Sequence, residues 1–224
     1  MSGPLVIIKQ TDDAMQMTPS EVKKMTAGQI DKAVANYRAL LEKHAGEFNS
    51  EAVQTVLGQS ELAEEHFQVF RTRVEAISNF IIRKVKVNRS RSPQQAIDAT
   101  GCTQYTDNTV VKVMPIGEGE EVDLYLIPFK KKLSVDNLEE AVDKAGFVLI
   151  DPITLCALNE ADPALADTIP NATQWRDKNG KACCAYFRRW AGERVVNIGR
   201  NDIGWHGFWF FGCVRKKSAE VSGS

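Results

Sequence analysis

The sequence predicts an α+β protein, in which an all-helical N-terminal segment precedes a compact mixed domain. Two observations indicate this division. Before about residue 90, apolar residues recur at steps of three and four, which is the spacing of amphipathic helices. After that point, short helical segments alternate with apolar runs bounded by glycine, proline and asparagine, the pattern of strands and turns. The length of 224 residues is sufficient for one large or two small domains.

The N-terminal part is expected to contain a loose arm over residues 1–17 and a helical domain, a hairpin or bundle, over 18–91. The first helix should begin at Thr18, because the sequence from Thr18 to Glu21 has the features of a capping box, with proline in the first turn. Its apolar face is formed by four residues at helical spacing: Ile30, Val34, Tyr37 and Leu41.

A second long helix is expected over residues 60–88, with Ser60 as its cap. Its apolar residues alternate steps of four and three, as in the seam of a bundle or coiled coil: Ala63, Phe67, Phe70, Val74, Ile77 and Ile81. Two interpretations fit this seam. The helix either completes an intramolecular hairpin, or it is the element through which copies of the chain form a homo-oligomer. The basic residues at its end are expected to be solvated, since cations are favoured at a helix C-terminus.

The mixed domain is expected over residues 92–217, followed by a disordered tail over 218–224. Its helices are predicted from capping serines or aspartates and terminating glycines, between 92 and 101, over 135–145 and from 152 to about 160. Its strands are predicted over 110–114, 121–128, 147–150, 172–176, 181–190, 193–199 and 208–216. The last four should be antiparallel, with a hairpin turn at Asn179-Gly180. Two helices followed by a twisted antiparallel sheet are compatible with a C-type-lectin-like fold.

Composition and charge narrow the classes of protein that fit. The net charge is −1, so no overall field draws the chain to nucleic acid or to an anionic membrane. The longest apolar runs are far shorter than the roughly 20 residues that cross a bilayer, and the N-terminus lacks the features of a signal peptide. The five cysteines lack metal-type spacing and are expected to be reduced. We therefore expect a cytoplasmic protein that contacts neither membrane nor nucleic acid.

No specific catalytic constellation is found in the sequence. There is neither a glycine-rich dinucleotide loop nor a phosphate loop. The three histidines, His44, His66 and His206, lie far apart, and no cluster of histidine, cysteine and acidic residues indicates zinc. No residue is identified that would activate a cysteine as a nucleophile. We expect no enzyme activity, no catalytic residues, no metal and no cofactor.

Three motifs in the second half of the chain resemble one family. They are Asp151-Pro152-x-x-Leu155-x-Ala157-x-Asn159-Glu160-Ala161-Asp162-Pro163, Asn171-Ala172-Thr173-x-Trp175 and Trp209-Phe210-Phe211-Gly212-x-x-Arg215-Lys216. Over residues 90–217 the chain resembles variable proteins of diversity-generating retroelements, within a group of bacterial proteins. In that family, a reverse transcriptase mutates adenines and the copy replaces the C-terminal coding region. The resemblance implies a C-type-lectin-like scaffold that displays diversified residues to varied ligands.

Residues 194–215 are the stretch where the resemblance implies a variable surface. Adenine-directed mutation of AAC or AAT codons cannot produce Lys, Glu, Gln, Met or Trp, and this stretch contains none of these apart from its two tryptophans. The residues expected to be displayed and to bind ligand are Val195, Asn197, Gly199, Asn201, Asp202, Ile203, Gly204, His206, Gly207, Phe208 and Phe210. The residues expected to hold the core or the sheet are Arg194, Val196, Arg200, Trp205, Trp209, Phe211, Gly212 and Arg215.

The hypothesis that follows is a display protein that binds a protein or another macromolecule through this C-terminal surface. One alternative is a structural or adaptor protein of a phage or mobile element, in which the same stretch is a fixed subunit contact. A second alternative is an oxidase of the formylglycine-generating type, which shares the lectin-like scaffold. In that case Cys183 or Cys184 would hold a metal together with Cys213.

Overall fold

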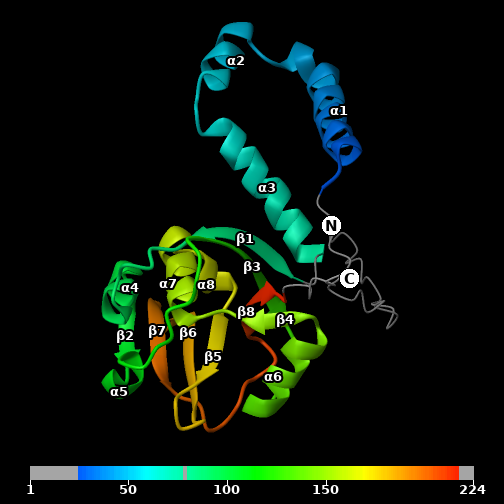
Figure 1. Ribbon diagram of the computed structural model, residues 1–224. Coiled ribbons are helices and arrows are strands. Elements are labelled where there is room, and N and C mark those ends of the chain that lie inside the picture. Colours follow the sequence, from blue (N-terminus) through cyan, green and yellow to red (C-terminus); the bar gives the residue numbers. More distant parts are fainter. Residues whose placement is uncertain (1–24, 78–79, 217–224) are drawn as a thin grey trace, which may run out of the picture. The chain divides into compact units, whose positions relative to one another are not determined.

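The computed structural model describes residues 25–77 and 80–216, which form two compact units divided between Gly46 and Glu47 (Figure 1). The arm predicted over 1–17, the cap predicted at Thr18 and the tail predicted over 218–224 lie outside the described residues. The protein has an α+β fold, as predicted, because helices and an eight-stranded sheet both contribute to it.

The first unit contains helix α1, Ala27–His44, which confirms the predicted helix around the apolar face at residues 30–41. Its described start is fixed by a capping box, in which the Thr26 hydroxyl accepts from the Gln29 amide and the Gln29 side chain accepts from the Thr26 amide. Every described residue of α1 is at least partly exposed, including Ile30, Val34 and Leu41 of the apolar face.

The second unit begins with helices α2, Ser50–Leu57, and α3, Leu62–Ile77. The apolar seam of α3 is exposed at Phe67, Phe70 and Val74. The hairpin and the self-association interpretations of this seam both stay predictions. None of the described helices combines the length and the hydropathy needed to cross a bilayer.

The helix predicted to continue to residue 88 ends at Ile77, and Ile81–Lys86 is strand β1 instead. The prediction was wrong because Ile81 fits both patterns. It continues the steps of the helical seam, but it also begins an alternation in which Ile81 and Val85 are buried and their neighbours are more exposed. Pairing with β3 selects the strand.

One mixed sheet organises the second unit, with the strands in the order β1-β3-β8-β5-β6-β7-β2, while β4 pairs with β8 beside β5. The remaining strands are β2, Thr103–Thr106; β3, Glu121–Pro128; β4, Phe147–Leu149; β5, Asn171–Arg176; β6, Ala182–Trp190; β7, Glu193–Arg200; and β8, Phe210–Arg215. The helices between them are α4, Pro93–Ala99; α5, Asn108–Val111; α6, Val135–Lys144; α7, Pro152–Ala161; and α8, Leu165–Thr168.

Three sequence predictions for this sheet are corrected. The strand predicted over 110–114 is α5 and a turn, because the Asp107 side chain accepts from the Thr109 amide at 2.8 Å and starts a helical turn. The edge strand β2 was not predicted. The predicted antiparallel order of the last four strands is correct for β5, β6 and β7. The fourth strand, β8, instead crosses back to pair parallel with β5 and antiparallel with β3.

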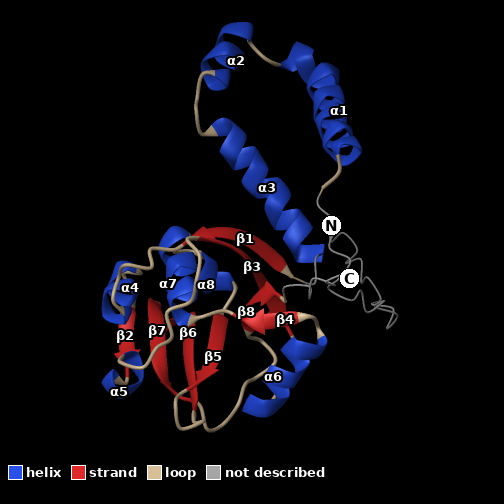
Figure 2. Ribbon diagram, in the orientation of Figure 1, coloured by secondary structure: helices blue, strands red, loops and turns tan. Residues whose placement is uncertain are grey.

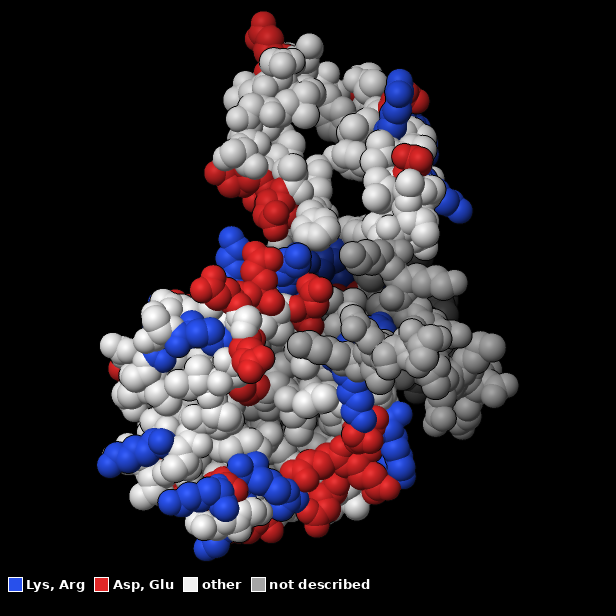
Figure 3. All heavy atoms as spheres, viewed as in Figure 1, with Lys and Arg blue, Asp and Glu red and all other residues white. Residues whose placement is uncertain are grey.

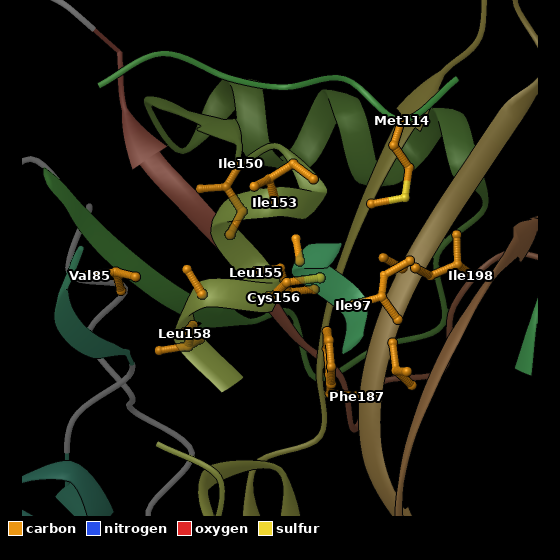
Figure 4. Packing of buried hydrophobic residues seen from close by; sticks show 14 of the residues in the cluster. Val85, Ile97, Met114, Ile150, Ile153, Leu155, Cys156, Leu158, Phe187 and Ile198 are labelled. Atoms are coloured by element: carbon orange, nitrogen blue, oxygen red, sulfur yellow. The ribbon is translucent and has the colours of Figure 1, made fainter. Parts of the chain in front are cut away.

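Helices cover the two faces of the sheet unequally (Figure 2). We call the side packed by α4, α5, α7 and α8 the first face, and the side packed by α6 the second face. The first core lies under the first face, where side chains of several elements converge (Figure 4): Val85, Ile97, Leu155, Cys156, Phe187 and Ile198. The second core is smaller and contains Leu138 and Val142 of α6 together with Trp205, Trp209 and Phe211.

Candidate functional site

The loop between β7 and β8 lies over the second face and is held by two buried tryptophans. Trp205 exchanges two backbone hydrogen bonds with Leu133, at 2.8 and 3.0 Å, and its indole Nε1 donates to Gln174 Oε1 at 2.7 Å. The rings of Trp205 and Trp209 meet edge to face with their centroids 5.6 Å apart. Trp205 also contacts Phe211 of β8, at 5.1 Å between centroids. These anchors fix the loop to the sheet.

Before and between the anchors, the loop exposes side chains of mixed chemistry. Ile203 is 85% exposed and Phe208 is 51% exposed, and Asp202 and His206 are also exposed. The rings of His206 and Phe208 stack with their planes 6° apart and centroids at 6.1 Å. Exposed apolar groups on a rigid support are typical of a recognition surface. Four of the residues that the sequence predicted as displayed are therefore brought together on this loop.

Val195 and Asn201 were predicted as displayed and are buried instead. Val195 lies on the second face, between Arg188 of β6 and Thr103 of β2, which are its register partners. The Asn201 side chain turns inward, where its Oδ1 accepts from the Gly204 amide at 3.0 Å. Strand alternation alone could not reveal the burial of Val195, because the prediction did not include β2 as a neighbour.

Gly204 and Gly207 were also predicted as displayed, but neither position has room for a side chain. A Cβ at Gly204 would lie 2.4 Å from the Leu133 carbonyl oxygen, and one at Gly207 would lie 2.6 Å from the Lys131 amide nitrogen. The two glycines let the loop approach the 130–134 segment closely. They belong with the fixed residues of the site.

The predicted candidates at Asn197, Gly199 and Phe210 are half-buried and lie on different faces. Asn197 and Gly199 face the second side, opposite Tyr186 and Cys184. Phe210 packs against the first core and therefore points away from the loop residues. Of these three residues, Asn197 agrees best with the prediction, because its side chain is only half-buried and lies on the second face, which the loop also covers.

The residues predicted as fixed are largely confirmed as parts of the core or the sheet. The buried members are Val196, Trp205, Trp209, Phe211 and Gly212. Arg194 donates to the Pro163 carbonyl oxygen at 3.1 Å, and Arg200 pairs with Asp177 at 2.6 Å. Arg215 is exposed and lies over the ring of Tyr125, at 5.2 Å from its centroid.

Aromatic rings and one arginine form a row that extends from the loop onto β6, and the sequence prediction missed its β6 members. We call this row the aromatic ridge, and its members are Trp190, Arg188, Tyr186, Trp209, Phe208 and His206. Tyr186 lies 4.9 Å from Trp209, and Trp209 lies 4.9 Å from Phe208, measured between ring centroids. The ridge thus joins the open part of the sheet to the exposed loop.

The β6 end of the ridge lies on a half of the second face that is open. Trp190 is 56% exposed, and Tyr105 of the edge strand β2 is 54% exposed. The guanidinium of Arg188 lies 4.3 Å from the Trp190 ring centroid and 5.6 Å from that of Tyr186. Alternation along β6 places these three side chains on one face, a signal that is present in the sequence of β6 itself.

The described residues contain no group of three or more histidine, cysteine or acidic side chains that could hold a metal, and their cysteines are free thiols. Cys183 and Cys184 point to opposite faces of β6, while Cys184 and Cys213 share the second core on strands separated by β5. Burial raises the pKa of the Cys184 thiol to about 12 and raises the pKa of Cys213 as well. This arrangement gives no support to the oxidase alternative.

The close approach of the loop gives a direct stability test. Gly204→Ala should destabilise the protein by about 1–3 kcal/mol more than Gly180→Ala, because overpacking against the Leu133 carbonyl adds to backbone strain. Gly180 is the matched control, since its φ of +74° resembles the +76° of Gly204 but nothing lies within 4 Å of its Cβ position. Chemical denaturation measures both, and equal effects would contradict the close approach.

Comparison of the chain with known protein families, with curated proteins and with solved structures finds no match. Its function must therefore be inferred from the anchored loop and the aromatic ridge.

Proposed function

We propose that this chain is a ligand-binding display protein with a C-type-lectin-like scaffold, whose exposed part of residues 194–215 is diversified by a retroelement. Its targets are proteins or other macromolecules, and it performs no catalysis. The resemblance of its motifs to variable proteins suggests the diversification. The fold supports binding at the same stretch through the contrast between rigid anchors and exposed residues in one short loop.

The observation that carries the proposal is the difference in solvent exposure between Trp205 and Ile203, which are two residues apart. Trp205 is buried with its indole hydrogen-bonded, whereas Ile203 is 85% exposed. A display surface needs positions that tolerate change next to positions that hold the fold. Exposed surface positions usually change stability by no more than about 0.5 kcal/mol when substituted. The loop offers such positions at Asp202, Ile203, His206 and Phe208.

Sequencing the gene in many isolates of one population tests the proposal. Replacements should concentrate at five exposed or half-exposed positions, because these can vary without disturbing the core: Asn197, Asp202, Ile203, His206 and Phe208. They should spare Val195, Asn201, Gly204, Trp205 and Gly207, which are buried or closely packed. A nearby template repeat that differs from the gene at adenines should accompany this pattern.

The flanking strand β6 supplies the internal control. Its replacement frequency sets the background, because the proposal does not place β6 in the diversified stretch. Replacements spread evenly over β6 and 194–215, or absent from both, would contradict diversification. They would favour the alternative of an adaptor protein whose loop is a constant contact.

A further inference from the structure

Arg188, in the aromatic ridge, has a guanidinium without a partner. Among the described residues it forms neither a hydrogen bond nor an ion pair, and its Nε atom is buried without any hydrogen-bond partner. Its contacts are the rings of Trp190 and Tyr186. A guanidinium carries five N–H donors, so a partly buried one without acceptors is an unsatisfied group.

Other arginines of the sheet show the usual alternative. The neighbouring Arg189 points to the first face, where it pairs with Asp167 at 2.9 Å and donates to the Gly192 carbonyl oxygen. Arg176 pairs with Asp136 and Glu139 of α6. On the face of the molecule in Figure 3, acidic and basic side chains lie next to one another. Arg188 differs from these pairs because none of its donors has a protein acceptor among the described residues.

The two rings hold the guanidinium in a defined position. Stacking against Trp190 and Tyr186 restricts its rotamers, so less conformational entropy is lost when an acceptor binds. A carboxylate is the acceptor whose geometry matches the guanidinium fork with two parallel hydrogen bonds. The site is therefore prepared for an anion and is open on the Trp190 side, where that ring is more than half exposed.

The surroundings favour a protein ligand over nucleic acid. Glu193 is the register partner of Trp190 on the same face and accepts from the Thr103 hydroxyl at 3.0 Å. This face therefore presents an acidic residue near Arg188 in sequence register instead of further cations, whereas nucleic-acid surfaces collect several cations to neutralise phosphates. Tryptophan, tyrosine and arginine are the residue types that dominate the binding energy of protein interfaces. Arg188, Trp190, Tyr186 and Tyr105 supply these types together.

We propose that Arg188, held between Trp190 and Tyr186, is a constant anchor that binds an aspartate or glutamate carboxylate of a protein ligand. The anchor lies outside the stretch proposed to be diversified. It would supply affinity that all ligands share, while the loop supplies selectivity. The inference names the ligand chemistry of the proposed binding surface and so rests on the proposed function.

A peptide titration followed by NMR tests the anchor on the full chain. The probe is acetyl-Tyr-Glu-amide, and its matched control is acetyl-Tyr-Gln-amide, which differs only in lacking the charge. The readouts are the Nε–H resonance of Arg188 and the indole N–H resonance of Trp190. We expect saturable shifts with the acidic peptide and binding weaker by about tenfold with the amide peptide, because a charge-assisted bidentate pair is lost.

Variants show whether Arg188 carries this preference. Arg188→Gln should abolish the difference between the two peptides, and Arg188→Lys should retain only part of it, since lysine lacks the planar fork. Arg189→Gln is the control, because it removes the adjacent guanidinium on the opposite face and should leave the preference unchanged. The Trp190 resonance reports on all variants, and their denaturation midpoints identify any that fail to fold.

Three outcomes would overturn the proposal. They are equal binding of the two peptides, no saturable shift with either, and tighter binding of inorganic phosphate than of the acidic peptide at the same resonances. None of them affects the pattern of gene replacements, so the anchor can fail while the proposed display function stands. Conversely, an invariant loop together with carboxylate binding at Arg188 would contradict the proposed diversification and leave the anchor proposal standing.

Discussion

Trp205→Ala is expected to lower the free energy of unfolding by about 3–5 kcal/mol, the cost of removing a large aromatic side chain from a core. Trp205 is 3% exposed, and its ring contacts those of Trp209 and Phe211. The substitution also leaves the Gln174 side-chain oxygen without the indole hydrogen bond, in a buried position. Both effects act on the element that holds the loop, so the loss should appear as lower global stability.

The controls for this prediction lie in the same loop and on β7. Asp202→Ala, His206→Ala and Asn197→Ala should each change the free energy of unfolding by no more than about 0.5 kcal/mol, because these side chains are exposed or half-exposed. Urea denaturation with one spectroscopic probe compares the four variants. If the three controls destabilised the protein as much as Trp205→Ala, the loop would be core throughout, and the display function would lose its main support.

The sequence predicted elements well where a local signal determined them. The helices α6 and α7 begin at a serine and an aspartate whose side chains accept from the backbone amide three residues later, and both were predicted close to their observed bounds. The β5–β6 hairpin followed from Asn179-Gly180, where Gly180 has a φ of +74°. Such signals act over a few residues and are visible without knowledge of the rest of the chain.

The errors arose where distant pairing chooses between local alternatives. Ile81 continues a helical seam and also begins a strand, and the choice depends on β3, about 40 residues later in the chain. Thr103–Thr106 has little apolar character and is a strand because β7 offers it a free edge. The last strand, β8, joins β3, β4 and β5 instead of β7. No periodicity within β8 could reveal that order.

The candidate site shows the same division. Trp205, Trp209 and Phe211 were correctly predicted as core, since large aromatics between small and polar residues usually pack inward. The burial of Val195 depends on β2, and the restriction at Gly204 depends on the Leu133 carbonyl, about 70 residues earlier in the chain. The aromatic ridge required the contact between Tyr186 and Trp209, which joins β6 to the loop. Contacts of this kind cannot be read from one stretch of sequence.

Arg89→Met is expected to lower the free energy of unfolding by about 3–5 kcal/mol, because it leaves a largely buried carboxylate without its ion-pair partner. Arg89 and Asp151 pair at 2.8 Å, and their side chains are 15% and 13% exposed. Arg89 also donates to the Thr154 hydroxyl at 2.8 Å and to the Gly119 carbonyl oxygen at 2.9 Å. One guanidinium therefore connects the segment after β1 with the loop before β3 and with the start of α7.

Asp151 gives this pair its importance for the fold. It caps α7 by accepting from the Thr154 amide at 3.0 Å, and α7 is buried from Pro152 to Asn159. Gly117 packs so closely on Asp151 that a Cβ there would lie 2.2 Å from the carboxylate. This close packing leaves the carboxylate little room to turn. Loss of Arg89 should thus destabilise the helix on which the first core is built.

The neighbouring Arg91 provides a matched control for this prediction. It pairs with Glu160 at 2.5 Å near the surface, where both side chains are about one-third exposed, so Arg91→Met should have only a small fraction of the effect. Asp151→Asn keeps a capping side chain and removes the charge. Combined with Arg89→Met, it should recover part of the lost stability, because the unpaired charge is the main cost. Urea denaturation of the four variants gives the coupling. Equal, small effects of Arg89→Met and Arg91→Met would mean that the Asp151 carboxylate reaches water and that the Arg89–Asp151 pair is not needed to hold α7 in place.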